Sequence, residues 1–232
     1  MSAKNKSKLN AITENLFLAG LGVYLFYLAL GTTTFNLAFP VFTEDLLLIC
    51  LTAVSVLRLG SFFILETSHR KNLLVMTICA LVMAANWMMV YRNDGYSFLR
   101  FLAVLTVGSV GCDFRKALKT YVIIIGTTLL VTVFCALGDT ITNLIYTNQN
   151  RFRSSWGIVY PTDFASYMIF LLVSAWIAWK NLPDWFFLIP GAGAFIIAYN
   201  IADSNTSSYC SLLVTIQNPQ KGNCKKLNFN KI

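Results

Sequence analysis

The run Leu46–Leu65 reads LLLICLTAVSVLRLGSFFIL and decides which class of fold to expect. It carries one charged side chain, Arg58, among apolar and small residues. About 20 such residues in a helix cross the hydrocarbon core of a bilayer. A helix is favoured inside lipid because it satisfies its backbone hydrogen bonds within one segment. The run therefore predicts a membrane-spanning helix.

The composition of the whole chain extends this prediction beyond one run. Of the 232 residues, 56% are apolar and 12% are charged, and the mean hydropathy is +0.63. A soluble domain carries about 25% charged residues. The net charge of +8 does not indicate nucleic-acid binding, because the Lys and Arg residues stand in short loops and tails beside apolar runs. The chain is predicted to be a polytopic membrane protein.

Further apolar runs predict an all-α transmembrane bundle of about seven spans and a partial eighth. The membrane domain is expected over residues 1–216, with a long polar loop over 138–162. The predicted spans are Leu16–Leu30, Leu46–Leu65, Leu73–Tyr91, Phe98–Gly111, Thr120–Leu137, Asp163–Trp179 and Asp184–Tyr199.

The end of the chain is predicted to differ from the rest. Ser207–Ile216 is apolar, but about ten residues cannot span a bilayer. We expect an eighth span that was lost through truncation or a shifted reading frame, or else a short interfacial segment. The basic tail 217–232 has no periodic apolar face and is expected to be disordered.

The distribution of Lys and Arg predicts the topology. With the N-terminus in the cytoplasm, the inner segments hold about nine of these residues and the outer segments about four, as the positive-inside rule requires. The opposite orientation reverses the bias. The predicted location is the bacterial plasma membrane, with the loop 138–162 on its outer face.

Within that loop, Arg151–Asp163 reads RFRSSWGIVYPTD and carries the first candidate site. Arg151 and Arg153 are two residues apart, and a pair of guanidinium groups on one side of a loop can clamp a phosphate or diphosphate. The alternative is that both arginines bind lipid headgroups or face water. Their position outside the membrane runs against the positive-inside bias and calls for a reason.

Three further residues of this segment have two interpretations each. Asp163 is predicted to be a first-turn acid that the helix dipole favours, with Thr162 as the N-cap, or a general base or partner of the arginines. Trp156 and Tyr160 offer aromatic surface to a sugar ring, or belong to the aromatic belt of the membrane interface.

Arg58 and two residues near the C-terminus complete the candidates. A charge in the middle of a span is expensive, so Arg58 is expected to face the bundle interior or a water-filled cavity and to have a partner there. Its role is either structural or substrate binding. Asp203 and Ser204 follow the last predicted span. They either hydrogen-bond a polar ligand at the outer face or form a solvated loop end.

Metal and cofactor sites are not predicted. The six cysteines lack metal-ligand spacing and are expected to pack as small hydrophobic residues. The single histidine, His69, stands in a short charged loop. A His-based metal site or catalytic triad is therefore excluded for this chain alone.

The pattern Arg151-x-Arg153-Ser-Ser-x-Gly157-x-x-Tyr160-Pro161-Thr-Asp163 resembles a segment of the bacterial O-antigen ligase and polymerase superfamily. In that family an arginine is followed by Gly, an aromatic residue or His, Pro, and Asn or Asp at the start of a span. The stretch Ala202–Ser207 is similar to the family's Ser-Arg-Thr element, with Asn205 in place of the arginine.

The resemblance implies an inverting membrane glycosyltransferase that builds surface polysaccharide, such as O-antigen, capsule or exopolysaccharide. Its substrate is an undecaprenyl-diphosphate-linked oligosaccharide at the outer face. Arg151 and Arg153 are then expected to stabilise the diphosphate leaving group, and Asp163 to orient them or to assist proton removal.

Other functional classes remain open at this point. The first is a non-catalytic remnant, which the shortened eighth run favours. The second is a transporter of small solutes or lipid-linked glycans, with its site near Arg58 and Pro190. The third is a small immunity or sensor protein.

Overall fold

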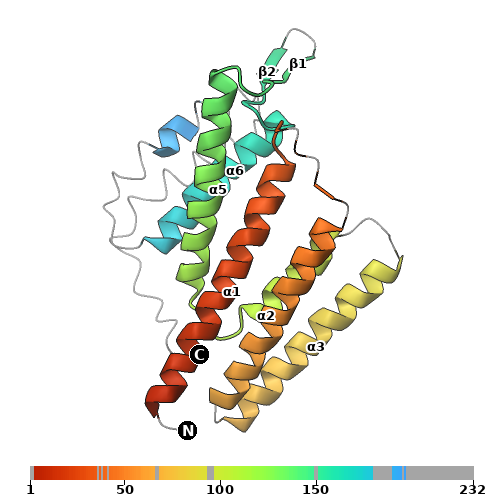
Figure 1. Ribbon diagram of the computed structural model, residues 1–232, viewed down its shortest axis with the longest axis vertical. Coiled ribbons are helices and arrows are strands. Elements are labelled where there is room, and N and C mark those ends of the chain that lie inside the picture. The colour runs from red at the N-terminus through yellow and green to blue at the C-terminus, as the bar shows by residue number, and fades with distance from the viewer. Residues whose placement is uncertain are drawn as a thin grey trace. The chain divides into compact units, whose positions relative to one another are not determined.

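A computed structural model describes most of the chain, in the order α1–α5, β1, β2 and α6 (Figure 1). The described residues are 3–35, 37, 39–40, 42–65, 68–92, 97–148, 151–179, 190–194 and 196. They are mostly helical, as predicted. The helices are α1 (Ala3–Gly31), α2 (Thr43–Leu65), α3 (His69–Arg92), α4 (Ser97–Gly108), α5 (Phe114–Leu137) and α6 (Pro161–Ala178).

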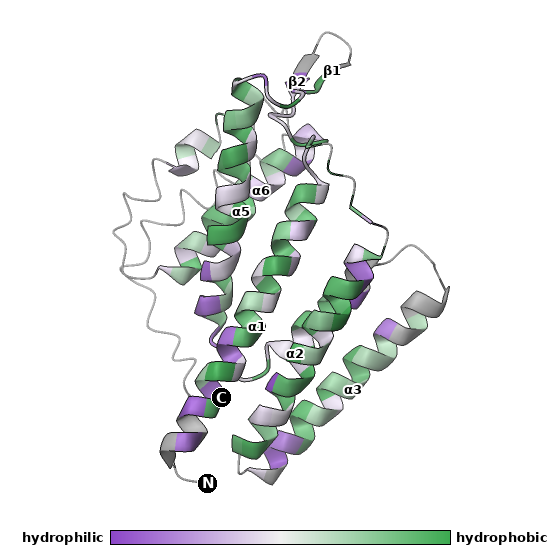
Figure 2. Ribbon diagram, in the orientation of Figure 1, coloured by the Kyte–Doolittle hydropathy of each residue, from purple (hydrophilic) through white to green (hydrophobic). Residues whose placement is uncertain are grey.

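Four of these helices are long and apolar enough to cross a membrane: Lys8–Gly31 within α1, α2, α5 and α6. Figure 2 shows apolar residues along most of α2 and α5 and hydrophilic residues at the start of α1. This number is smaller than the predicted seven. Helix α4 has 12 residues, which corresponds to about 18 Å and is too short for the hydrocarbon core. Most of the predicted seventh span and all of 207–232 lie outside the described residues.

Two helices begin earlier than their apolar runs. Helix α1 starts at Ala3 rather than near Leu16, and α5 starts at Phe114 rather than near Thr120. Hydropathy marks only the part of a helix that lies in lipid. Lys, Arg and Glu are good helix formers, so polar residues extend a helix beyond its apolar part.

The all-α prediction misses a β-hairpin in the polar segment 138–162. Strands β1 (Ile145–Asn148) and β2 (Arg151–Ser154) pair antiparallel, with Ile145 opposite Ser154 and Tyr146 opposite Arg153. A two-stranded hairpin is marginally stable by itself. Its occurrence here therefore depends on the contacts that anchor it.

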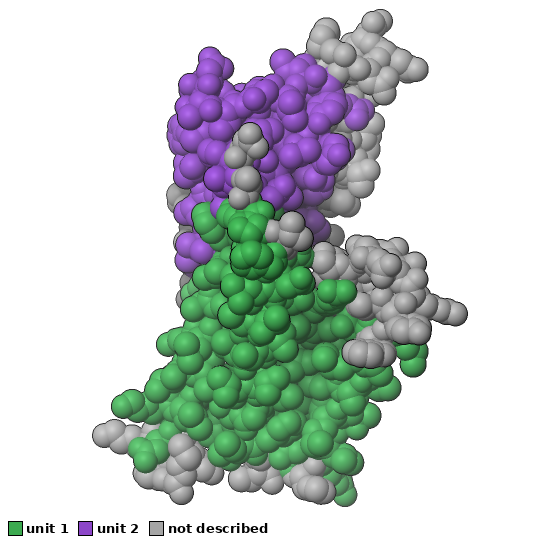
Figure 3. Space-filling model, turned by 45° about the vertical axis from the view of Figure 1, so that its right-hand side comes forward, with its two compact units in different colours: residues 1–28, 38–120 green, residues 29–37, 121–232 purple. Residues whose placement is uncertain are grey.

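The structure divides into two compact units, which Figure 3 colours separately. Unit 1 comprises residues 1–28 and 38–120, and unit 2 comprises residues 29–37 and 121–232. The core of unit 1 contains residues of α1, α2 and α4: Phe17, Leu21, Tyr24, Leu51, Phe101 and Val104. Gly108 permits this packing, because a Cβ atom there would collide with Phe17 and with the Ser55 hydroxyl.

Candidate functional site

The arginine-containing segment of unit 2 is anchored to the residues at the C-terminal end of α1. The Thr34 N–H donates to the Gly157 carbonyl and the Val159 N–H donates to the Thr32 carbonyl, each at 2.8 Å. Between these bonds, Thr33 and Ile158 form an antiparallel bridge. Residues 32–34 thus pair with 157–159 as two short antiparallel strands would, apart from the β1–β2 sheet. The segment is held in one place by backbone hydrogen bonds.

A tight turn between β2 and α6 adds to this order. Trp156 and Gly157 both have left-handed backbones, with φ of 51° and 80°. A Cβ atom at Gly157 would lie 2.8 Å from Ile141 and 2.9 Å from Thr132. Glycine is therefore required at this position for both its backbone and its close packing.

Asn143 fixes the turn from the preceding loop. Its side-chain oxygen accepts a hydrogen bond from the Trp156 N–H at 2.9 Å and another from the Ser154 hydroxyl at 3.0 Å. Asn143 was not predicted from the sequence. An Asn shortly after a helix is a common turn residue, and its partner 13 residues further along the chain is not visible in a sequence pattern.

Tyr160 belongs to an aromatic pair with Tyr146 of β1. The ring centroids are 6.3 Å apart, and the Tyr146 hydroxyl donates to the Val159 carbonyl at 2.7 Å. Tyr160 is 55% exposed. The pair presents aromatic surface at the base of the hairpin, which suits either a sugar ring or a membrane interface.

Both candidate arginines belong to β2. Arg151 is in register with Asn148, and Arg153 is in register with Tyr146. Positions two apart in a strand lie on the same face of the ribbon. The strand therefore has the backbone geometry that a two-arginine clamp requires.

Asp163 is the third residue of α6, and Tyr160 is the N-cap. The prediction that Thr162 is the N-cap is wrong. Pro161 takes the first helical position because its fixed φ and missing N–H suit the first turn. The prediction of Asp163 as a first-turn acid is confirmed. In the described residues, no hydrogen bond or ion pair joins Asp163 to Arg153.

Arg58 belongs to unit 1 and is 1% exposed. One guanidinium nitrogen donates to the Asn10 carbonyl, the Asn10 side-chain oxygen and the Thr13 hydroxyl. The other donates to the Gly111 carbonyl in the turn before α5. Arg58 thus connects α1, α2 and this turn. These contacts favour the structural interpretation of Arg58 over substrate binding.

A buried carboxylate lies next to this arginine site. Glu14 is 5% exposed, forms a salt bridge with Lys116 at 2.9 Å, and accepts a hydrogen bond from the Asp113 N–H at 3.0 Å. The Cys112 thiol approaches the same carboxylate at 3.7 Å. Burial, with a smaller contribution from Glu14, raises the pKa of the Cys112 thiol to about 11. The thiol therefore stays protonated at neutral pH.

The roles of Asn10, Thr13 and Glu14 in this buried polar network were not predicted from the sequence. Their spacing of three and four residues places them on one helix face, which was a usable signal. It was missed because the polar N-terminus was not expected to be helical.

Asp203 and Ser204 lie outside the described residues. Within the described residues, no group of three or more His, Cys, Asp or Glu side chains has the arrangement of a metal site.

Together these features define a helical membrane protein whose unit 2 contains an ordered, arginine-bearing hairpin. Comparison of the chain with protein-family models, with curated proteins and with solved structures finds no match. The family resemblance therefore remains a prediction from the residues Arg151–Asp163 and Ala202–Ser207.

Proposed function

We propose that this protein is a membrane glycosyltransferase of the polysaccharide-polymerase type, which binds undecaprenyl-diphosphate-linked oligosaccharide. The observation that supports this proposal is that the segment directly after β2 is anchored by the backbone hydrogen bonds between residues 32–34 and 157–159. A cation clamp must be held in place before the reaction, because electrostatic stabilisation is largest when no reorganisation is needed. A freely moving loop would not meet this requirement.

The proposed reaction is an inverting glycosyl transfer. A hydroxyl group of the acceptor glycan attacks the anomeric carbon of the donor, and the bond from that carbon to the diphosphate oxygen breaks. Arg151 and Arg153 stabilise the negative charge that gathers on the departing lipid diphosphate. The proton of the attacking hydroxyl passes to the carboxylate of Asp163, which lies in the first turn of α6 and close to the hairpin in the chain.

The proposed location of this chemistry is the outer face of the bacterial plasma membrane. The positive-inside distribution supports it, because the hairpin follows α5, whose opposite end carries Arg115, Lys116 and Lys119. In the polymerase family that the segment Arg151–Asp163 resembles, lipid-linked repeat units are joined at that face.

Binding of the lipid carrier tests the proposal. The protein, purified and placed in nanodiscs, is expected to retain undecaprenyl diphosphate but not undecaprenol, which has the same chain and no phosphate. Equal retention of both lipids would show that only the hydrocarbon chain is bound, and would contradict a phosphate clamp.

A further inference from the structure

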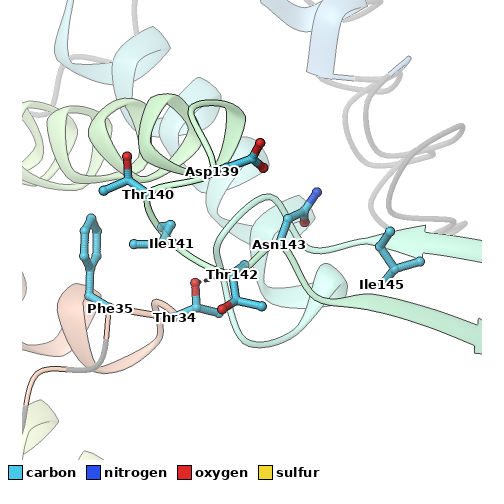
Figure 4. Close-up of a pocket in the computed structure, with 8 residues that line it drawn as sticks. All are labelled: Thr34, Phe35, Asp139, Thr140, Ile141, Thr142, Asn143 and Ile145. Carbon is cyan, nitrogen blue, oxygen red and sulfur yellow. Dashed lines mark hydrogen bonds between the residues drawn. The ribbon is translucent and has the colours of Figure 1, made fainter.

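Unit 2 contains an open cavity where α5 ends (Figure 4). Its volume is about 740 Å³, within the range of small-molecule sites. The loop from α5 to β1 forms most of its wall, and the segment after α1 forms the rest. The lining residues are Thr34, Phe35, Asp139, Thr140, Ile141, Thr142, Asn143 and Ile145.

Asp139, in the wall of this cavity, breaks two rules of helix termination. Helix α5 ends in a Schellman motif, because the Thr140 N–H donates to the Cys135 carbonyl and the Asp139 N–H donates to the Ala136 carbonyl. The left-handed position of this motif favours Gly, yet it is occupied by Asp139, with a φ of 54°. The negative end of the helix dipole also disfavours a carboxylate there. Where a natural protein breaks such local rules, a functional or strained site is expected.

The two sides of the cavity wall are joined by a hydrogen bond, and the wall offers further hydrogen-bonding groups to a ligand. The Thr34 hydroxyl donates to the Thr142 carbonyl at 2.8 Å, which ties the two sides of the wall together. The side-chain oxygen of Asn143 is used by the turn, which leaves its NH₂ group as a donor. In the part of the chain that the structure describes, the Asp139 carboxylate forms no hydrogen bond or ion pair.

The charge of the lining selects the class of ligand. Asp139 is the charged residue among the eight, and none of them is Lys or Arg. A phosphate or a sugar acid would be repelled by the carboxylate. A neutral sugar offers hydroxyl donors to Asp139 and acceptors to Asn143, while Phe35 and Ile141 offer apolar surface to its C–H groups.

We propose that this cavity binds a neutral sugar unit through the side chains of Asp139 and Asn143. In the context of the proposed function, on which this assignment rests, the unit belongs to the lipid-linked glycan. Two sites then bind different parts of one substrate: the hairpin arginines bind the diphosphate, and the cavity, whose lining has no Lys or Arg, binds the sugar.

Saturation-transfer NMR on the purified protein in nanodiscs tests this assignment. The probes are the methyl glycosides of glucose, galactose and N-acetylglucosamine. We expect at least one of them to bind, and Asp139→Asn to weaken that binding about tenfold, because a hydrogen bond to a charged group is lost. Asn tolerates the left-handed backbone, so the fold is retained. Asp113→Asn in unit 1 is the matched control and should leave binding unchanged.

A second variant separates binding from stability. Asp139→Gly is expected to abolish glycoside binding while it keeps or raises the melting temperature, because Gly suits the left-handed position. Failure of all three glycosides to bind, or unchanged binding by either Asp139 variant, would overturn the assignment. Retention of undecaprenyl diphosphate should not change in these variants. Glycoside binding without retention of the carrier would instead count against the proposed function.

Discussion

Arg58→Ala is expected to yield little or no folded protein. The guanidinium is buried and donates to Asn10, Thr13 and Gly111, so its removal leaves these acceptors unpaired between α1, α2 and the turn before α5. Each buried acceptor that is left unpaired costs about 1–3 kcal/mol, and Arg58→Ala leaves several of them. This is a large share of the roughly 5–15 kcal/mol that stabilises a folded protein. Yield of monodisperse protein and melting temperature in detergent are the measurements.

Arg100→Ala is the matched control for this prediction. Arg100 pairs with Asp45 at 4.0 Å, but their side chains are 43% and 69% exposed. An exposed pair contributes about 0–1 kcal/mol, so this variant should melt within a few degrees of the natural protein. An Arg58→Ala protein as stable as the Arg100→Ala protein would contradict the structural role. If it also lost the bound carrier, Arg58 would belong to the substrate site instead.

Replacing Arg151 and Arg153 together with alanine is expected to weaken retention of undecaprenyl diphosphate by about two orders of magnitude. Hydrogen bonds to charged groups contribute about 1.5–3 kcal/mol each, and the clamp supplies at least two of them. The variant with lysine at both positions keeps the two charges but loses the planar guanidinium groups. Its affinity for undecaprenyl diphosphate should therefore lie between those of the natural protein and the double alanine variant. Affinity is measured in nanodiscs for each variant.

This prediction has two controls. Arg115→Ala removes an arginine from the start of α5, away from the hairpin in sequence, and should leave retention of the carrier unchanged. Melting curves show whether the hairpin variants remain folded. A folded double alanine variant that binds the carrier as well as the natural protein would remove Arg151 and Arg153 from the site.

The sequence predicted the helices well where hydropathy alone determines them. The run Leu46–Leu65 matches α2, and Leu73–Tyr91 lies within α3 with a small error at each end. Arg58 was expected to be buried with a partner, and it is. The partners Asn10 and Thr13 were not identified, because they are 48 and 45 residues away in sequence and lie in a stretch that hydropathy assigns to a tail.

The hairpin was not predicted, for a related reason. Strands of four residues carry a weak pattern, and the segment after β2 is anchored by the pairing of 157–159 with residues 32–34, more than 100 positions earlier in the chain. Gly157 and the Arg151–Asp163 motif were found from residue types alone. Asn143 and Asp139 were not found, because the role of each side chain depends on a turn geometry that only the folded chain shows.

The proposal that the hairpin arginines bind an extracytoplasmic lipid diphosphate requires the hairpin to lie on the outer side of the membrane, and this can be measured. A cysteine introduced by Thr147→Cys in β1 is treated, in intact cells, with a maleimide that cannot cross the membrane. Labelling is measured as the gain over the parent chain, with Arg115→Cys as the control for the opposite side. Strong labelling of the cysteine at 147 is expected in intact cells, and labelling of the cysteine at 115 only after the membrane is opened. Labelling at 147 only after opening would place the arginines in the cytoplasm and would contradict a clamp for an extracytoplasmic lipid diphosphate.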